Sequence, residues 1–336
     1  MTERFRFVPP KQAPKGLWRR VPPIIFMSIM GMLGLALAWR SGVAHLAAPS
    51  GLSGFLDGIA VALFLFSVTA YICKIVRRPA VLAEECLTLP GRVGIASAVV
   101  CVYLAAGVFA AHMPGLGRVI LVLGLLGQAG LIAADLWQII AQRKAGQAGM
   151  RSQGRLRPGP DWQLKWSGVL VAANIALILG WPGLANLLLW PGVAMTLMIA
   201  LLSLWQLLRE RFPRQMYVLL TLHVVPAAAF GMVVQQLGLP FQHVVLVLVL
   251  IGVMAMPWLI VLGRGGIFLS ALCYPVSAAA QFFILQYAAS PGGLFFRLSA
   301  VLMLVVATLV TIPLTFFTMR DWARGRLAIR SNSAIA

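Results

Sequence analysis

The sequence contains few charged residues and very few acidic ones. Only 10% of its 336 residues are charged, whereas 61% are hydrophobic, and the mean hydropathy is +0.92. A soluble domain carries about 25% charged residues, so this chain lacks the polar side chains needed to cover a water-exposed surface. The composition therefore predicts a membrane protein.

Several kinds of site are also missing. The four cysteines, Cys73, Cys86, Cys101 and Cys273, have no C-x-x-C spacing and lie in or beside apolar segments, which argues against a zinc site or a disulfide framework. The sequence has neither a Walker A nor a G-x-G-x-x-G motif, which argues against an ATP-driven pump. We therefore expect no cofactor and no bound metal.

The positive charge of the chain is large but dispersed. The net charge of +19 comes from 27 Lys and Arg residues, which form short clusters between apolar segments. Nucleic acid is therefore not an expected partner. Basic residues are retained on the cytoplasmic side of membranes, and an N-terminus in the cytoplasm places all but three of them there. The exceptions are Arg40, Arg118 and Arg297.

Apolar runs of about 20 residues predict ten membrane-spanning helices. The expected spans are 22–39, 52–76, 92–112, 118–140, 166–182, 184–208, 215–236, 241–262, 266–287 and 294–319. The organisation is then a basic cytoplasmic N-terminal segment (1–21), a ten-helix transmembrane domain (22–319) and a cytoplasmic C-terminal tail (320–336). The expected location is the bacterial inner membrane.

Ten spans with short external loops form five hairpins in an all-α membrane protein. If the odd-numbered helices form an inner ring, their small and weakly polar residues should line a central pore. The predicted pore-lining residues are Gly31, Gly34, Ser97, Cys101, Asn174, Thr221, His223, Pro226, Ser270, Pro275, Ser277 and Gln281. Alternatively, such residues only allow membrane helices to pack closely and hydrogen-bond. Pro226 and Pro275 should bend their helices because each removes a backbone hydrogen bond.

Ionisable groups inside the predicted spans are rare, and such groups often mark function because burying a charge costs several kcal/mol. His223 and Asp135 are possible proton sites. The alternatives are that His223 is a neutral core histidine and that Asp135 and Asp57 are interfacial. Without fixed lumenal charges or a carboxylate ring, the pore favours weak anion binding and fast passage.

Four short segments along the chain have recognisable patterns. They are Gly31 and Gly34 with Leu35-Ala36-Leu37-Ala38-Trp39 in the first helix, Leu89-Pro90-Gly91-Arg92-Val93, Tyr274-Pro275, and Thr318-Met319-Arg320 followed by Gly325-Arg326-Leu327. Together they resemble the tellurite-resistance/dicarboxylate transporter family, which includes the slow anion channels of plant guard cells. The resemblance covers nearly the whole chain.

This resemblance implies a homotrimer in a lipid membrane, in which each protomer has a pore formed by the five odd helices and closed by a phenylalanine. Tyr274 is at the matching position and is the expected gate; its phenol can block by bulk or donate a hydrogen bond to an anion. The implied substrates are small anions: halide or nitrate, tellurite-like oxyanions, or C4-dicarboxylates. Passive and proton-coupled routes both remain open.

Two other functions are considered. The first is a membrane scaffold that transports nothing. The second is a membrane-embedded enzyme, which would need paired acidic groups or a nucleophile and base near one interface. Asp57 and Asp135 are the best acidic candidates, but we expect them at opposite membrane faces. Catalysis is therefore not the expected function.

Overall fold

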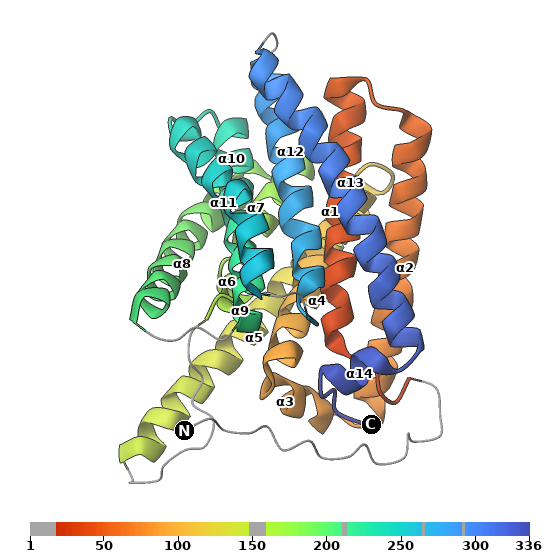
Figure 1. Cartoon of the computed structure of the whole chain (residues 1–336), viewed down its shortest axis with the longest axis vertical. Coiled ribbons are helices and arrows are strands. Elements are labelled where there is room, and N and C mark those ends of the chain that lie inside the picture. Colours follow the sequence, from red (N-terminus) through yellow and green to blue (C-terminus); the bar gives the residue numbers. More distant parts are fainter. Residues whose placement is uncertain (1–17, 148–158, 210–213, 264–265, 291–292) are drawn as a thin grey trace.

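The computed structural model describes residues 18–147, 159–209, 214–263, 266–290 and 293–336. Residues 1–17 of the predicted N-terminal segment lie outside the described residues. Every regular element within the described residues is helical (Figure 1). The 3-10 helices are η1 (Pro23–Ile25), η2 (Leu220–His223) and η3 (Leu269–Leu272). The α-helices are α1 (Phe26–Leu46), α2 (Ser50–Arg77), α3 (Ala80–Cys86), α4 (Leu89–Ala110), α5 (Pro114–Gln147), α6 (Trp162–Trp166), α7 (Gly168–Ile178), α8 (Pro182–Arg209), α9 (Arg214–Leu219), α10 (Val224–Gln236), α11 (Gln242–Gly263), α12 (Cys273–Ala289), α13 (Leu294–Ala323) and α14 (Arg326–Arg330).

Nine of the ten predicted spans have a counterpart of spanning length. Within the described residues, nine helical segments are long and apolar enough to cross a membrane, and each overlaps a predicted span. The exception is the predicted fifth span, 166–182. Its place is taken by α7, whose 11 residues extend only about 16 Å at 1.5 Å per residue, against a hydrocarbon core about 30 Å thick.

The short length of α7 has local causes. Gly180 adopts the left-handed conformation with a φ of 75°, which ends the helix as glycine commonly does. Pro182 then begins α8. At the other end, Ser167 separates α7 from the short helix α6. The chain therefore turns between the predicted fifth and sixth spans, and α7 ends at Ile178, before the predicted end of the fifth span.

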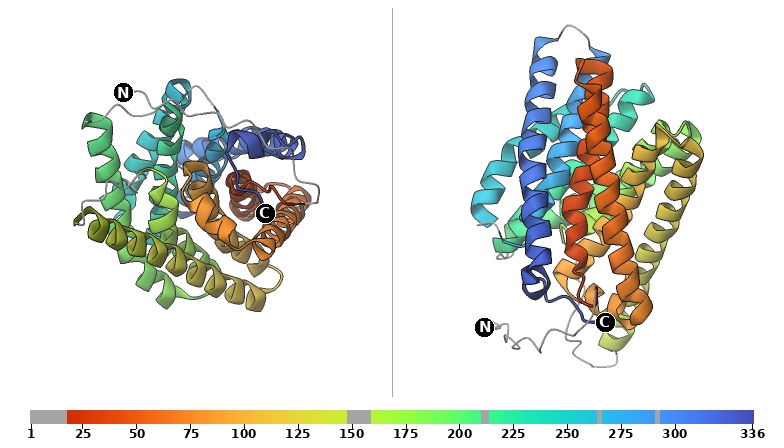
Figure 2. Two further views of the ribbon diagram at one scale, coloured as in Figure 1. Left: turned by 90° about the horizontal axis from the view of Figure 1, so that it is seen from below. Right: turned by 90° about the vertical axis from the view of Figure 1, so that its right-hand side faces the viewer.

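The helices alternate between buried and exposed along the chain. In the spans that contain α1, α4, α10 and α12, between 72% and 89% of the most apolar stretch is buried, against 17% to 33% for α2, α5, α8, α11 and α13. The buried helices contact one another in a closed order: α1 with α4, α4 with α7, α7 with α10, α10 with α12, and α12 with α1. They form an inner ring of five helices, surrounded by apolar outer helices (Figure 2).

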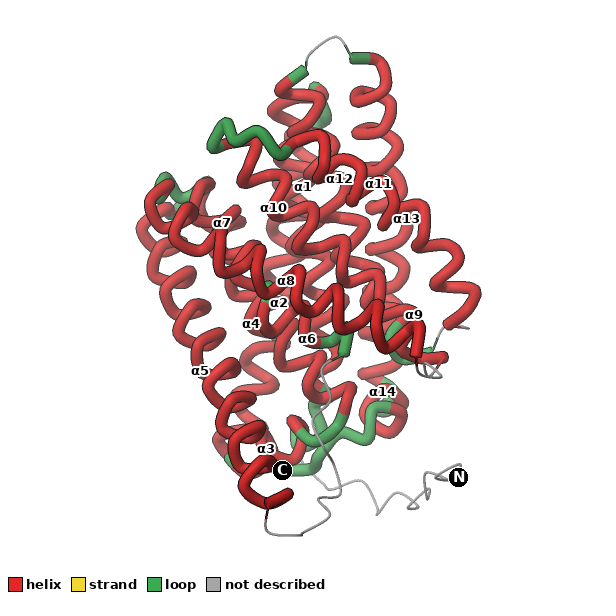
Figure 3. The backbone as a smooth tube through the Cα atoms, turned by 90° about the vertical axis from the view of Figure 1, so that its left-hand side faces the viewer, coloured by secondary structure: helices red, strands yellow, loops and turns green. Residues whose placement is uncertain are grey.

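All five inner helices run in the same direction. Each starts toward the end of the molecule that carries α3 and α14, which is at the bottom of Figure 1 and is called the lower end below. The tube in Figure 3 shows the short elements α6 and α9 below α7 and α10. The two ends of the described chain also meet at the lower end, where the Ala336 amide donates to the Arg19 carbonyl at 2.9 Å.

The two inner-ring prolines lie inside helical spans, Met216–Gln236 and Leu269–Ala289, as expected from the sequence. Pro226 and Pro275 each lie in the first turn of an α-helix, α10 or α12, directly after the 3-10 helix η2 or η3. A proline in the first turn removes an N–H that has no partner within the α-helix. The irregularity is therefore a change of helix type before each proline, and the α-helices that follow are uninterrupted.

Candidate functional site

The predicted gate lies at the closest contact inside the ring, between α1 and α12. Tyr274 is 4% exposed, and a Cβ atom added to Gly34 would lie only 2.7 Å from its ring carbon Cδ2. Gly31 lies even closer to Cys273 and has no room for a side chain. These two glycines therefore allow α12 to place the Tyr274 ring directly against the backbone of α1.

Ser277 joins three helices. Its hydroxyl lies 3.2 Å from the Gly31 carbonyl on α1, 2.8 Å from the Cys273 carbonyl on α12, and 3.3 Å from the Thr311 hydroxyl on the outer helix α13. The side chain is fully buried. Its contacts match the alternative interpretation of weakly polar residues, namely hydrogen bonding between packed membrane helices.

The predicted residues on α4 bond to backbone carbonyls of α4 itself and of α1. The Ser97 hydroxyl donates to the Val93 carbonyl at 2.8 Å, and the Cys101 thiol donates to the Phe26 carbonyl at 3.3 Å. Both side chains are fully buried. This part of the ring is closed by helix packing.

Thr221, His223 and Ser270 lie on or beside the 3-10 helices η2 and η3, which contact each other. The Thr221 hydroxyl donates to the Val218 carbonyl at 2.7 Å, and His223 Nδ1 lies 3.0 Å from the Leu220 carbonyl. His223 Nε2 is buried and has no hydrogen-bond partner among the described residues. With Nδ1 donating, Nε2 carries the lone pair and can accept a hydrogen bond.

A cavity reaches this level of the ring from the lower end. It has a volume of about 230 Å³, lies between η3, α13 and α14, and is lined in part by Ser270. Asp321 and Arg330 also line it and approach each other to 3.3 Å. Ser270 is thus a predicted pore residue that borders a cavity.

Side-chain amides gather toward the opposite, upper half of the ring. Gln236 of α10 donates to the Asn174 side-chain oxygen of α7 at 3.2 Å. Gln281 of α12 is buried, and Gln235 donates to the Leu285 carbonyl. The polar groups predicted on α7 and α12 are therefore buried, and Asn174 bonds to the neighbouring helix of the ring, α10.

Asp135 is an ion-pair partner. Its Oδ1 lies 2.6 Å from Lys165 Nζ, and its Oδ2 accepts a hydrogen bond from Trp166 Nε1 at 3.3 Å. Asp135 is 2% exposed, so its carboxylate is enclosed by protein. Because Lys165 directly precedes the predicted fifth span, it was expected in a cytoplasmic loop, and the pairing was not foreseen.

A neighbouring acid, Asp161, is also buried near positive charge. Its Oδ2 lies 3.5 Å from Arg92 Nε, but neither atom has a hydrogen-bond partner among the described residues. Burial raises the pKa of the Asp161 carboxyl above its ordinary value, and the charges of Arg92 and Lys165 oppose this shift. Asp161 therefore binds a proton more readily than a solvent-exposed aspartate does.

A second buried charge cluster, not predicted from the sequence, lies at the lower end. Lys74 and Glu85 form a fully buried ion pair; Tyr71 donates to Glu85 Oε2 at 2.6 Å, and Lys74 also donates to the Val21 carbonyl at 2.7 Å. Ser333, near the end of the chain, accepts from Lys74 and donates to Glu85, both at 3.0 Å. The available signal was the i, i+3 spacing of Tyr71 and Lys74, followed by an acid on the next helix.

Arginines close the upper ends of two inner helices. Arg40 lies 2.6 Å from Asp57 and donates to the Gly107 and Val108 carbonyls at the end of α4, each at 3.0 Å. Arg118 donates to the Leu179 carbonyl after α7. Cations suit the carbonyl-rich ends of helices, so these arginines have a local structural role.

These features define an all-α, multi-pass membrane protein with a closed inner ring. No group of three or more His, Cys, Asp or Glu side chains is placed to hold a metal ion within the described part of the chain. No protein-family model matches the chain, and no curated protein matches its sequence.

Proposed function

We propose that this protein transports small anions across the bacterial inner membrane through the centre of the five-helix ring. The observation that carries the proposal is the parallel direction of α1, α4, α7, α10 and α12, which all start toward the lower end. The resemblance noted in the sequence supports the same function. A homotrimer with one pore in each protomer belongs to the proposal on the strength of that resemblance alone.

Parallel helices favour anions at the end where they start. Each helix dipole is equivalent to about half a positive charge at the N-terminus, and five parallel dipoles reinforce one another at the lower end. Nearly all Lys and Arg residues precede inner helices or follow outer ones. In our proposal the lower end faces the cytoplasm, consistent with retention of basic residues there, and attracts anions to the pore mouth.

Weakly polar walls suit passage in this proposal. The ring interior offers hydroxyl, amide and imidazole groups from residues such as Ser270, His223 and Gln281, which are buried or half-buried. Such groups bind an anion more weakly than a fixed arginine does, and release it more readily. Tyr274, packed against Gly34, acts as the gate, and its displacement opens the pathway.

The proposal is tested by anion flux into liposomes that contain the purified protein. The panel comprises chloride, nitrate, tellurite and malate. Tyr274→Ala should increase flux of the accepted anion, while Tyr287→Ala, the same change in a half-buried residue near the upper end of α12, should leave it near the wild-type rate. If neither the wild type nor Tyr274→Ala passes any anion on the panel, the protein is not a transporter and the scaffold function is favoured.

A proton-coupled mechanism is distinguished from a channel by the pH response. His223 has a buried Nε2 without a hydrogen-bond partner among the described residues, which makes it the group to test. In a coupled transporter, His223→Gln should abolish the pH dependence of uptake and retain binding. In a channel, the current should not depend on pH in this way, and His223→Gln should change only the conductance.

A further inference from the structure

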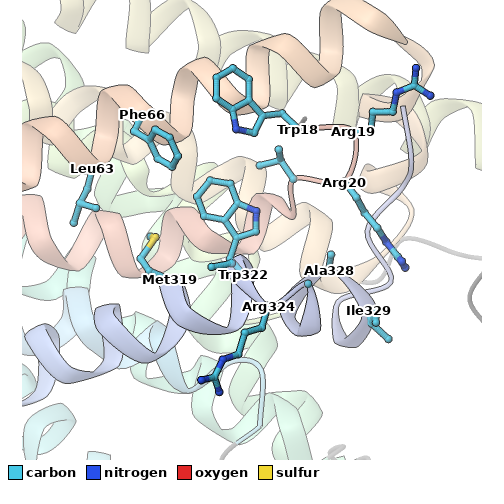
Figure 4. Close-up of a pocket in the computed structure, with 13 residues that line it drawn as sticks. Trp18, Arg19, Arg20, Leu63, Phe66, Met319, Trp322, Arg324, Ala328 and Ile329 are labelled. Carbon is cyan, nitrogen blue, oxygen red and sulfur yellow. The ribbon is translucent and has the colours of Figure 1, made fainter. Parts of the chain in front are cut away.

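A groove at the lower end of the molecule has no part in the proposed pore. Its volume is about 730 Å³, and it lies between the outer helices α2 and α13, with α14 and residues 18–21 at its base (Figure 4). The volume is within the range of small-molecule sites, about 300–1,000 Å³. Because α2 and α13 are outer helices with apolar, mostly unburied faces, the groove opens toward the lipid.

One part of the groove is aromatic. The rings of Trp18 and Phe66 are 6.3 Å apart, and those of Phe66 and Trp322 are 5.5 Å apart. Figure 4 shows these three rings facing one another, with Leu63 and Met319 beside them. Phe66 is 50% exposed. Tryptophan favours the boundary between headgroups and hydrocarbon, so this wall fits the part of an acyl chain that lies next to the headgroup.

The other part is strongly basic. Arg19, Arg20 and Arg324 line the same groove, and no acidic residue is among its described lining residues. Arg19 and Arg324 are exposed. Arg20 Nε is buried and has no hydrogen-bond partner among the described residues. A buried guanidinium N–H without a partner is costly, and a phosphate oxygen is a suitable acceptor for it.

We propose that this groove binds one anionic phospholipid, with its headgroup among Arg19, Arg20 and Arg324, whose side chains point in different directions in Figure 4, and with an acyl chain lying along the aromatic wall. Basic pockets between membrane helices bind anionic headgroups in this way. A free phosphate ion would contact the arginines and leave the aromatic wall uncovered. A zwitterionic lipid would bring the positive charge of its own headgroup close to the arginines. The inference does not depend on the transport of anions through the ring.

The first test uses the wild-type protein in mixed micelles and tryptophan fluorescence. Phosphatidylglycerol brominated on its acyl chains should quench Trp18 and Trp322 with a saturable component at low mole fraction. Phosphatidylcholine with the same brominated chains should lack this component, and inorganic phosphate should not compete. In Trp322→Phe the saturable amplitude should decrease. Equal quenching by the two lipids at equal mole fraction would overturn the proposal.

The second test separates the groove from the general positive charge of this end. Arg19→Gln with Arg324→Gln should weaken phosphatidylglycerol binding by roughly thirtyfold, since each arginine contributes about 1 kcal/mol near an anionic surface. The matched control is Arg209→Gln with Arg214→Gln, which removes two exposed arginines that do not line the groove. The control should bind as the wild type does. An equal loss in both double variants would show bulk attraction and defeat the proposal; if the groove variant does not fold, the wild-type quenching comparison decides.

Discussion

Lys165 Nζ lies 2.6 Å from Asp135 Oδ1, in a position where both side chains are less than 5% exposed. The two residues are on α6 and α5, and Trp166 donates to the second carboxylate oxygen. Moving each charge out of water costs several kcal/mol, which a well-placed partner offsets. The pair therefore fixes the short helix α6 against α5 at the level where the inner helix α7 begins.

Removing one member of this pair should be severe. In Asp135→Asn the Lys165 charge loses its buried partner, and we expect a loss of about 3–5 kcal/mol in the free energy of unfolding, measured by denaturant titration in detergent. Asp135→Asn with Lys165→Gln should recover part of this loss because no charge is left unpaired. Asp321→Asn, at a pair whose arginine is 60% exposed, serves as the control and should change stability by less than about 1 kcal/mol.

The same variants test the proton-site interpretation of Asp135. If Asp135→Asn folds with wild-type stability and only removes a pH dependence of flux, the carboxylate carries protons and the ion pair is not structural. If Asp135→Asn with Lys165→Gln is as unstable as Asp135→Asn alone, the unpaired buried charge of Lys165 is not the reason for the loss of stability. Either outcome contradicts the role assigned here to the pair.

The sequence was sufficient for the outline of the fold. Apolar runs of about 20 residues are typical of membrane-spanning helices, so nine spans were predicted close to their observed positions. The alternation of inner and outer helices was also visible, because small residues such as Gly31 and Gly34 gather on alternate spans. The length of α7 was not predictable from hydropathy, since Leu179 and Trp181 continue the apolar run beyond the point where Gly180 ends the helix.

The partners of the charged residues could not be predicted from the sequence. Lys74 and Lys165 were assigned to the cytoplasmic side by the positive-inside rule, which gives the side of the membrane and says nothing of burial. Both are in fact buried in ion pairs. Glu85 lies 11 residues from Lys74 and on a separate helix, and Ser333 is 259 residues away. Such contacts depend on tertiary structure, and the local spacing of Tyr71 and Lys74 does not identify their partners.

The Lys74 and Glu85 pair offers a comparison between adjacent residues. Glu85→Gln should cost about 3–5 kcal/mol because it leaves Lys74 buried without its counter-charge. Glu84→Gln breaks only an exposed pair with Arg78, which is worth at most about 1 kcal/mol. Ser333→Ala should cost about 1 kcal/mol, the net value of a hydrogen bond. Thermal and denaturant unfolding of the three variants provide the measurement.

This comparison also tests the position of the chain end. If Ser333→Ala has no effect and Glu85→Gln retains its full cost, the cluster is held by α2 and α3 without the C-terminal residues. If Glu84→Gln is as destabilising as Glu85→Gln, the burial of Lys74 and Glu85 does not distinguish the two acids, and the cluster is not the cause of the loss.

Asp161 should give stability a specific pH dependence. Its pKa is raised by burial, so the folded state binds a proton more tightly than the unfolded chain. The resulting contribution is complete below the ordinary aspartate pKa of about 3.9 and is lost as the pH rises through the raised value. The unfolding free energy of the wild type, relative to that of Asp161→Asn, should therefore decrease as the pH increases. A constant difference across that range, or one that changes in the opposite direction, contradicts the prediction.

The contact between Gly34 and Tyr274 is the most direct test of the gate. Gly34→Ala forces a methyl group to within 2.7 Å of the tyrosine ring and should cost about 1–3 kcal/mol as overpacking. Gly58→Ala, on α2 with nothing within 4 Å of the added carbon, is the control and should be neutral or stabilising by up to about 1 kcal/mol. In a Tyr274→Ala background the Gly34→Ala cost should largely disappear, giving a coupling energy of at least about 1 kcal/mol in a double-mutant cycle.

Flux measurements connect this contact to the proposed function. They use the four proteins of the double-mutant cycle: the wild type, Gly34→Ala, Tyr274→Ala and the variant with both changes. If Tyr274 closes the pore by resting on Gly34, the methyl group of Gly34→Ala displaces the ring and should raise basal anion flux above that of the wild type. Tyr274→Ala should raise it further, and adding Gly34→Ala should then have little additional effect because the ring is already absent. Additive effects on flux, or strong coupling in stability without any change in flux, would mean that the two residues contact each other only as part of the helix packing.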